Sequence, residues 1–313
     1  MTQESRNPDI VVITCALTGV LANRKQNTAI PYTAAEIADE AKRAYDAGAS
    51  VVHIHARNAD GSPTFEPAVF AEIKKEIRAR CPIILNFSTG TILDDVSQQI
   101  RYLEESRPEI GAVNMGTMNY AKYSKKKKSF EFDMIFPNPY GKILKLLEAM
   151  KRVGVKPELE CFDSGHTQGI APLLDMGALV EPYQFSFIVN VLGGIPPMIE
   201  SLQFQTKIMP PGSDWEVIGI SHGHWRMLAS ALVLGGNIRT GLEDHLYLPN
   251  GEKASSNGAM VEVAARMTRD IGREPATVEE ARELLHLYDV PAGVQAAKDV
   301  GHARKADAPA VHA

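Results

Sequence analysis

The chain has 313 residues, of which 44% are hydrophobic and 23% charged, a composition typical of folded globular proteins. Its net charge of -5 argues against a nucleic-acid-binding protein, which needs concentrated positive charge. No apolar run approaches the roughly 18 residues of a membrane span, and the N-terminus lacks a basic start and an apolar secretory segment. Cys15, Cys81 and Cys161 are too scattered for a disulfide framework. We therefore expect a cytoplasmic protein that binds neither nucleic acid nor membranes.

Short β-rich segments recur along the chain at regular intervals. Each is apolar or mixed in character and has the length of a buried parallel strand. Eight strands are predicted: Ile10–Thr14, Ser50–Ala56, Pro82–Ser88, Gly111–Met115, Lys156–Phe162, Tyr183–Val191, Trp215–Ile220 and Asn237–Leu242.

A helical segment with apolar residues at three- and four-residue spacing follows each predicted strand. The first begins at a capping box, with Thr33 at the N-cap and Glu36 three residues later, and ends near Gly48. The other predicted helices are Glu66–Arg80, Asp94–Ser106, Lys142–Val153, Gly169–Leu179, Pro197–Met209, Trp225–Leu234 and Ala259–Ile271.

Eight strand–helix units predict an α/β fold, a (β/α)8 TIM barrel, as one catalytic domain over residues 9–272. A doubly wound sheet would usually carry G-x-G-x-x-G after its first strand, and that motif is absent. Residues 273–313 are predicted to form a C-terminal helix and tail, with an arm or a disordered segment after about Val290. The run Lys125–Lys128 is predicted to be a solvated loop rather than an anion-binding patch.

Two histidines lie at the C-terminal end of the second predicted strand, where the active site of such a barrel is located. His53 and His55 are two residues apart, so in a strand both project to the same side. Two imidazoles at one barrel mouth can supply two ligands of a metal site. The alternative is a pair of histidines that hydrogen-bond within the core.

The last predicted strand supplies a third ligand type. It places Arg239, Glu243 and Asp244 around its C-terminal end. In a closed barrel this strand borders the first strand, whose other neighbour carries His53 and His55, so Glu243 can reach them. Two histidines, one carboxylate and an open position describe a divalent-metal site, with zinc as the leading candidate. A rim carboxylate beside a stabilising Arg–Asp pair is the alternative.

Other polar residues follow the remaining predicted strands. His222 and His224 lie in a loop that leads into a helix, and we interpret them as substrate-side or rim residues rather than primary ligands. No G-x-S-x-G elbow, P-loop or H-E-x-x-H motif is present, so esterase, nucleoside triphosphatase and zincin functions have no support. Further polar candidates are Ser88–Gly90, Asn114–Asn119, Glu160, Asp163 and His166.

Five motifs together resemble those of the β-keto acid cleavage enzymes, a family that includes the 3-keto-5-aminohexanoate cleavage enzyme of lysine fermentation. H-x-H-x-R and R-x-G-L-E-D are specific as a set, and the similarity runs from about Ile10 to Met267. The motifs are Ala16–Gly19, His53–Arg57, Asn86–Gly90, Pro157–Glu160 and Gly241–Asp244.

The resemblance implies a zinc-dependent barrel, usually a homo-oligomer, here expected to be a dimer or tetramer. Members condense a β-keto acid with acetyl-CoA and yield acetoacetate and a new acyl-CoA. Carried over residue by residue, one Zn²⁺ per chain would be held by His53, His55 and Glu243, and Arg239 with Asp244 would activate the keto acid. Substrate contacts are expected at Ser88, Thr89, Gly90, Thr117 and Leu21.

The chain departs from this family at one position that bears on the substrate. The aminohexanoate-cleaving members carry a glutamate soon after Thr-Gly, where it can pair with the substrate ammonium, and here Leu21 takes that place. A buried ammonium without a partner costs several kcal/mol. We therefore expect a neutral keto acid, or an anionic one only if Arg24 or Lys25 turns inward. Alternatively, another carboxylate such as Glu160 serves the cation.

Three functions follow from these patterns. The primary hypothesis is acyl-CoA-forming β-keto acid cleavage. The second is a metal-dependent aldolase or hydrolase on the same barrel, which would need a further ligand or base such as His222 or Asp163. The third is a barrel that only binds a ligand or serves as a scaffold, and the intact set of ligands and dyad argues against it.

Overall fold

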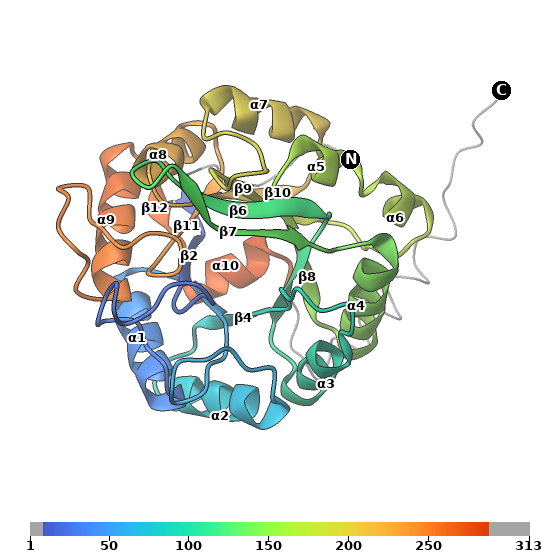
Figure 1. Ribbon diagram of the computed structural model, residues 1–313, viewed down its shortest axis with the longest axis horizontal. Helices are drawn as coiled ribbons and strands as arrows, with labels where there is room; N and C mark the ends of the chain where they lie inside the picture. The colour runs from blue at the N-terminus through green and yellow to red at the C-terminus, as the bar shows by residue number, and fades with distance from the viewer. Residues whose placement is uncertain (1–8, 288–313) are drawn as a thin grey trace.

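Eight parallel strands close into a barrel surrounded by helices in the computed structural model, which describes residues 9–287 (Figure 1). The order around the barrel is β10-β11-β2-β3-β4-β5-β8-β9, so the predicted (β/α)8 barrel is confirmed. The barrel strands are β2 (Ile13–Ala16), β3 (Val51–Ile54), β4 (Ile84–Ser88), β5 (Ile110–Asn114), β8 (Lys156–Cys161), β9 (Gln184–Val189), β10 (Asp214–Gly219) and β11 (Asn237–Thr240).

The helices form a ring outside the strands. Thr33 and Glu36 form the predicted capping box, and the first helix ends at Gly48 in the left-handed conformation, as the sequence indicates. The helices of the ring are α1 (Ala34–Ala47), α2 (Pro67–Arg78), α3 (Ser97–Ser106), α4 (Tyr140–Val153), α5 (Ser164–Gln168), α6 (Ala171–Asp175), α7 (Ile199–Ile208), α8 (His224–Val233) and α9 (Asn257–Asp270).

The main core lies between the outer face of the strands and the helices. Phe70 of α2 stacks on Tyr102 of α3 with ring centroids 3.9 Å apart, and both rings lie beside Phe87 of β4. All three side chains are fully buried. Burial of each side chain contributes about 1.5–3 kcal/mol to stability. These contacts hold β4 and its C-terminal end in place.

The N-terminal end of the barrel is closed by a second small cluster. Strand β1 (Ile10–Val11) pairs with β12 (Glu274–Pro275), and α10 (Val278–Leu284) packs buried Val278 and Ala281 beneath the barrel. The predicted strand Ile10–Thr14 is therefore wrong in its bounds, because its first two residues pair outside the barrel. The predicted tail beyond Val290 lies outside the described residues.

A β-hairpin extends the chain between β5 and α4. Its strands are β6 (Met118–Ser124) and β7 (Ser129–Phe136), and it lies across the C-terminal opening of the barrel (Figure 1). Ala121 of β6 bridges to Leu192 after β9, so the hairpin is also attached to the loop that follows β9. The predicted solvated loop Lys125–Lys128 is the exposed turn of this hairpin.

One predicted helix is divided in two. The sequence indicates a helix over Gly169–Leu179, whereas the structure has α5 before Gly169 and α6 after it. Pro172 lies in the first turn of the second helix, and its missing N–H makes it suited to that position rather than to a helix interior. Within residues 9–287, no helix has the length and apolar character needed to cross a membrane.

Candidate active site

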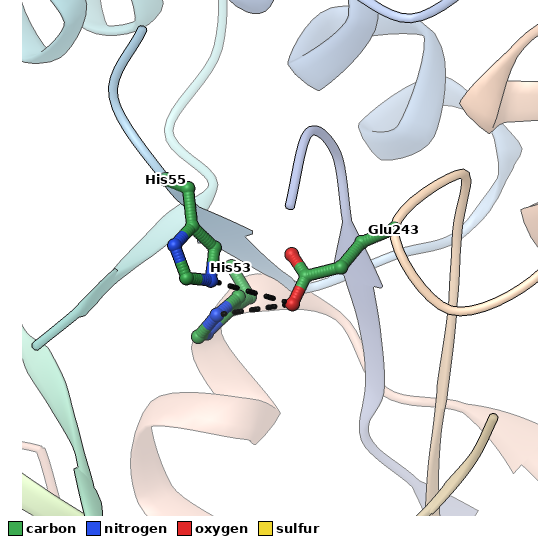
Figure 2. A group of neighbouring side chains, drawn as sticks. All are labelled: His53, His55 and Glu243. Atoms are coloured by element: carbon green, nitrogen blue, oxygen red, sulfur yellow. Dashed lines mark ion pairs between the residues drawn. The ribbon is translucent and has the colours of Figure 1, made fainter. Parts of the chain in front are cut away.

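Three candidate metal ligands converge at the mouth of the barrel (Figure 2). His53 lies in β3, His55 directly after it, and Glu243 in the loop after β11. The Nε2 atoms of His53 and His55 lie 3.7 Å and 3.4 Å from Oε1 of Glu243. Among the described residues, this is the one group of three side chains close enough to hold a metal ion, with ligand atoms within 4.8 Å of one another. The predicted convergence is therefore present.

The protonation of these side chains fits a divalent metal. His53 is buried, and neither ring nitrogen has a hydrogen-bond partner among the described residues. Burial, and then Arg239, lower the pKa of His53 well below its usual range, so the imidazole is neutral. Burial alone would raise the pKa of Glu243, but Arg239 and the two histidines hold it well below its usual range. A neutral imidazole and an ionised carboxylate are the forms that bind zinc.

Two glycines let the loops approach closely enough to place Glu243. Gly19, with φ of 57°, donates its N–H to Oε2 of Glu243 over 3.1 Å. A Cβ at Gly19 would lie 2.7 Å from Cγ of Glu243, and one at Gly241 would lie 2.2 Å from the carbonyl oxygen of Ala16. Both distances are too short for any side chain, so these positions require glycine.

Arg239 binds three carboxylates beside the triad. Its Nε and Nη2 donate to the two oxygens of Asp244 over 3.1 Å and 2.9 Å, a bidentate pair. Nη2 also donates to Glu243 over 2.6 Å, and Nη1 donates to Glu160 over 3.4 Å. Arg239 therefore links the predicted catalytic dyad to the metal triad through direct contacts.

The acidic partners of Arg239 differ in proton affinity. Burial raises the pKa of Asp244 to about 6, although Arg239 opposes this effect. Burial, and then the charge of Glu158, raise the pKa of Glu160 to about 8. Near neutral pH, Asp244 is mainly ionised and Glu160 mainly protonated. The sequence indicated Glu160 as a strand-end residue, but it gave no sign of the contact with Arg239.

A buried polar network lies deeper in the barrel. Asn86 and the Ser186 hydroxyl bind Glu158, and Ser186 also lies 3.1 Å from Glu216. Thr14 donates to Glu216 over 2.7 Å. Burial, and then the charge of Glu158, raise the pKa of Glu216 well above its usual range, which favours the protonated form of this carboxyl. Sequence reasoning missed the network, although acidic residues inside apolar strands were a visible signal.

The family model for beta-keto acid cleavage enzymes matches residues 10–287. The chain belongs to this family. The 3-keto-5-aminohexanoate cleavage enzyme of Fusobacterium nucleatum is 36% identical over 278 residues, covering 88% of this chain and 98% of the relative. The 3-oxoadipate:acetyl-CoA acetyltransferase of Cupriavidus necator is 31% identical over 280 residues, covering 88% and 94%. These two relatives are named for different keto acids, and each aligns with 88% of this chain.

The fold likeness extends to a solved structure of low sequence identity. The apo structure of ObcA superposes with a TM-score of 0.71 at 18% identity, over 83% of this chain and 66% of that protein. At this identity the likeness supports the barrel fold alone. The assignment of this β-keto acid cleavage enzyme to its family therefore depends on the sequence comparisons and not on the superposition.

The predicted substrate-binding residues lie on three loops of this family member. The buried Ser88 hydroxyl accepts the N–H of Gly90 over 3.3 Å, while Thr89 donates to the backbone of the neighbouring strand. Thr117 is exposed and accepts the N–H of Asn138 over 2.8 Å. Leu21 is 50% exposed and lies two residues after Gly19, which contacts Glu243.

Two basic residues follow Leu21 in the same loop. Arg24 donates to the carbonyl of Ile30 and forms an ion pair with Glu36 at 2.6 Å, while Lys25 is exposed. Arg24 is therefore held by its own loop and by the first turn of α1, and its guanidinium is not free to pair with an anionic substrate tail.

The second histidine pair has no part in the triad. His222 is exposed, as expected of a rim residue. His224 is instead buried: its Nδ1 lies 2.6 Å from the carbonyl oxygen of Gly219 and its Nε2 lies 2.9 Å from the Thr240 hydroxyl. The interpretation of His224 as a rim residue is wrong, because it begins α8 and its ring turns inward between β10 and β11.

Proposed function

We propose that this protein is a zinc-dependent enzyme that condenses a β-keto acid with acetyl-CoA and yields acetoacetate and a new acyl-CoA. The observation that carries the proposal is the direct contact between the Arg239–Asp244 pair and Glu243 of the histidine triad. Family membership and the acetyl-CoA named for several relatives support the same reaction.

The triad would hold the metal in a site with an open position. His53, His55 and Glu243 supply two neutral nitrogens and one carboxylate, a donor set that zinc accepts. When bound, zinc would act as a Lewis acid that makes the C2 protons of the keto acid more acidic. One ion per chain is expected from the single group of ligands in residues 9–287.

Asp244 would act as the base. Its pKa of about 6 leaves it ionised at neutral pH and still able to accept a proton from C2. Two bonds from Arg239 fix the orientation of its carboxylate. C2 would then attack the acetyl carbonyl, and CoA thiolate would leave. Attack of the thiolate on the original ketone breaks its bond to C2 and releases acetoacetate, with the proton returned by Asp244.

We further propose that the substrate has an uncharged tail. Leu21, rather than a carboxylate, occupies the loop after β2. Glu160 is an unsuitable partner for an ammonium, because its pKa of about 8 keeps it mainly protonated and Arg239 already contacts it. The proposal also includes a cytoplasmic homo-oligomer, which cell fractionation and light scattering would test.

The proposed reaction is tested with a panel of substrates. Zinc-loaded protein is incubated with acetyl-CoA and β-keto acids whose tails are neutral, anionic or aminated, and acetoacetate is measured. Acetoacetate formation with a neutral tail is expected, and Asp244→Asn protein serves as the control for catalysis at this site. No acetoacetate from any member of a chemically broad panel would contradict the proposal.

A further inference from the structure

The hairpin has one face toward the barrel mouth. Met118 of β6 is buried and Tyr120 half-buried, while Asn119 between them is exposed. Met118 and Tyr120 pair with Phe136 and Met134 of β7. This inner face packs on apolar residues at the ends of the barrel strands, which brings the hairpin over the site (Figure 1). The apolar residues beneath it are Phe162, Ile188, Val191, Ile218 and Ile220.

Tyr120 is held on this face by aromatic neighbours. Its ring centroid lies 5.9 Å from that of Phe132, 5.8 Å from that of Phe136 and 6.1 Å from that of Phe162. Contacts with three rings restrict the movement of the phenol ring. Phe132 and Phe136 come from the hairpin and Phe162 from the end of β8, so the position of Tyr120 is set by both.

The Tyr120 phenol belongs to the inner face of the hairpin, which packs on the ends of the barrel strands. Burial, and then the charges of Glu243, Asp244 and Glu160, raise the pKa of Tyr120 to about 12. Among the described residues, it has no hydrogen-bond partner, although its ring contacts are well defined. A protonated hydroxyl without a partner, above a catalytic site, is a donor available to a ligand.

The proposed reaction needs such a donor. When C2 of the keto acid attacks acetyl-CoA, negative charge develops on the thioester oxygen, and fixed donors stabilise such charge. Arg239 already binds Asp244, Glu243 and Glu160. The Tyr120 hydroxyl belongs to the hairpin, which lies across the C-terminal opening of the barrel.

We propose that the Tyr120 hydroxyl donates a hydrogen bond to the thioester carbonyl oxygen of acetyl-CoA and stabilises the charge that forms there. This inference rests on the proposed function. It makes the hairpin part of the active site and assigns to Tyr120 a catalytic role for which the sequence motifs gave no indication. In this proposal, the aromatic neighbours restrict the ring that carries the hydroxyl.

The test compares Tyr120→Phe with Tyr123→Phe. Tyr123 lies on the same hairpin and is 45% exposed, so its variant controls for loss of a hydroxyl there. Loss of one oxyanion donor lowers turnover by about 10²–10³-fold. We expect a fall of this order in kcat for Tyr120→Phe, with zinc content and thermal unfolding unchanged, and no change for Tyr123→Phe. A kcat for Tyr120→Phe within threefold of the unmodified protein would overturn the proposal.

A second measurement separates this proposal from the proposed function. The probe is a ¹³C-carbonyl ketone analogue of acetyl-CoA in which CH₂ replaces sulfur, so no acyl transfer occurs. Its bound carbonyl resonance should lie further downfield in the unmodified protein than in Tyr120→Phe. Equal shifts would overturn the role of Tyr120 even if acetoacetate forms. A shift difference without any acetoacetate formation would support the contact and contradict the proposed function. Failure of the analogue to bind the unmodified protein would contradict both.

Discussion

At the scale of single residues, the orphaned nitrogens of His53 lead to a prediction about metal content. Purified protein should contain about one divalent ion per chain. His53→Ala/His55→Ala should lose that ion and still fold, because neither side chain belongs to the core between strands and helices. Elemental analysis and circular dichroism measure the two outcomes. His222→Ala is the control, since His222 is exposed and outside the triad. Stoichiometric metal in the double variant would refute the site.

The carboxylate of Asp244 gives a second prediction. Asp244→Asn keeps the shape of the side chain but removes the base, so kcat should fall by about 10²–10⁴-fold while metal content is unchanged. Steady-state kinetics and elemental analysis of the same preparation test both parts. A variant with nearly unmodified kcat would show that Asp244 is not the base.

Leu21 gives a prediction about specificity. Leu21→Glu should raise the preference for an aminated over a neutral β-keto acid by about tenfold or more, since a carboxylate can pair with the ammonium and about 1.4 kcal/mol suffices for that factor. Val20→Glu is the matched control, because Val20 is the exposed neighbour in the same loop. Competition assays give the ratio of kcat/KM. Preference of the unmodified protein for the aminated acid would contradict an uncharged substrate tail.

At the scale of elements, His224 fixes the start of α8 against two strands. Its pKa is lowered to about 3, chiefly by burial, against about 6.5 in the unfolded chain. Above pH 6.5 the imidazole is neutral in both states. As the pH falls from 6.5 toward 3, the unfolded chain takes up a proton that the folded protein does not, so the free energy of unfolding decreases.

Replacement of His224 tests this effect. His224→Leu should lower the stability at pH 7.5 by about 2–4 kcal/mol, because the Thr240 hydroxyl and the Gly219 carbonyl lose their partner. It should also lose less further stability than the unmodified protein on acidification to pH 5.5. Urea unfolding at both pH values measures this difference, with exposed His222→Leu as the control. The same pH dependence in both proteins would contradict it.

The elements show which local patterns the sequence encodes clearly. The capping box at Thr33 and Glu36 depends on neighbours three residues apart, so the start of α1 could be predicted. The hairpin could not, since its turn consists of Lys125–Lys128, without the glycine or asparagine that marks a tight turn. Pairing of Ile10–Val11 with Glu274–Pro275 joins residues far apart in the sequence and was equally invisible.

At the scale of the whole molecule, closure of the barrel brings the site together. The approach of Glu243 to His53 and His55 could be predicted, because it follows from strand order in a closed barrel. The contact of Glu160 with Arg239 and the position of Tyr120 on the inner face of the hairpin depend on side-chain packing across the mouth. No spacing in the sequence reports such packing.

The central claim is that the acetyl group of acetyl-CoA becomes part of acetoacetate. It is tested most directly with acetyl-CoA labelled with ¹³C at both acetyl carbons, zinc-loaded protein and an unlabelled neutral β-keto acid. Carbon NMR should show the label at C3 and C4 of acetoacetate, while the new acyl-CoA, built from the keto acid tail, remains unlabelled. Labelled free acetate with no labelled acetoacetate would show hydrolysis instead and contradict the account.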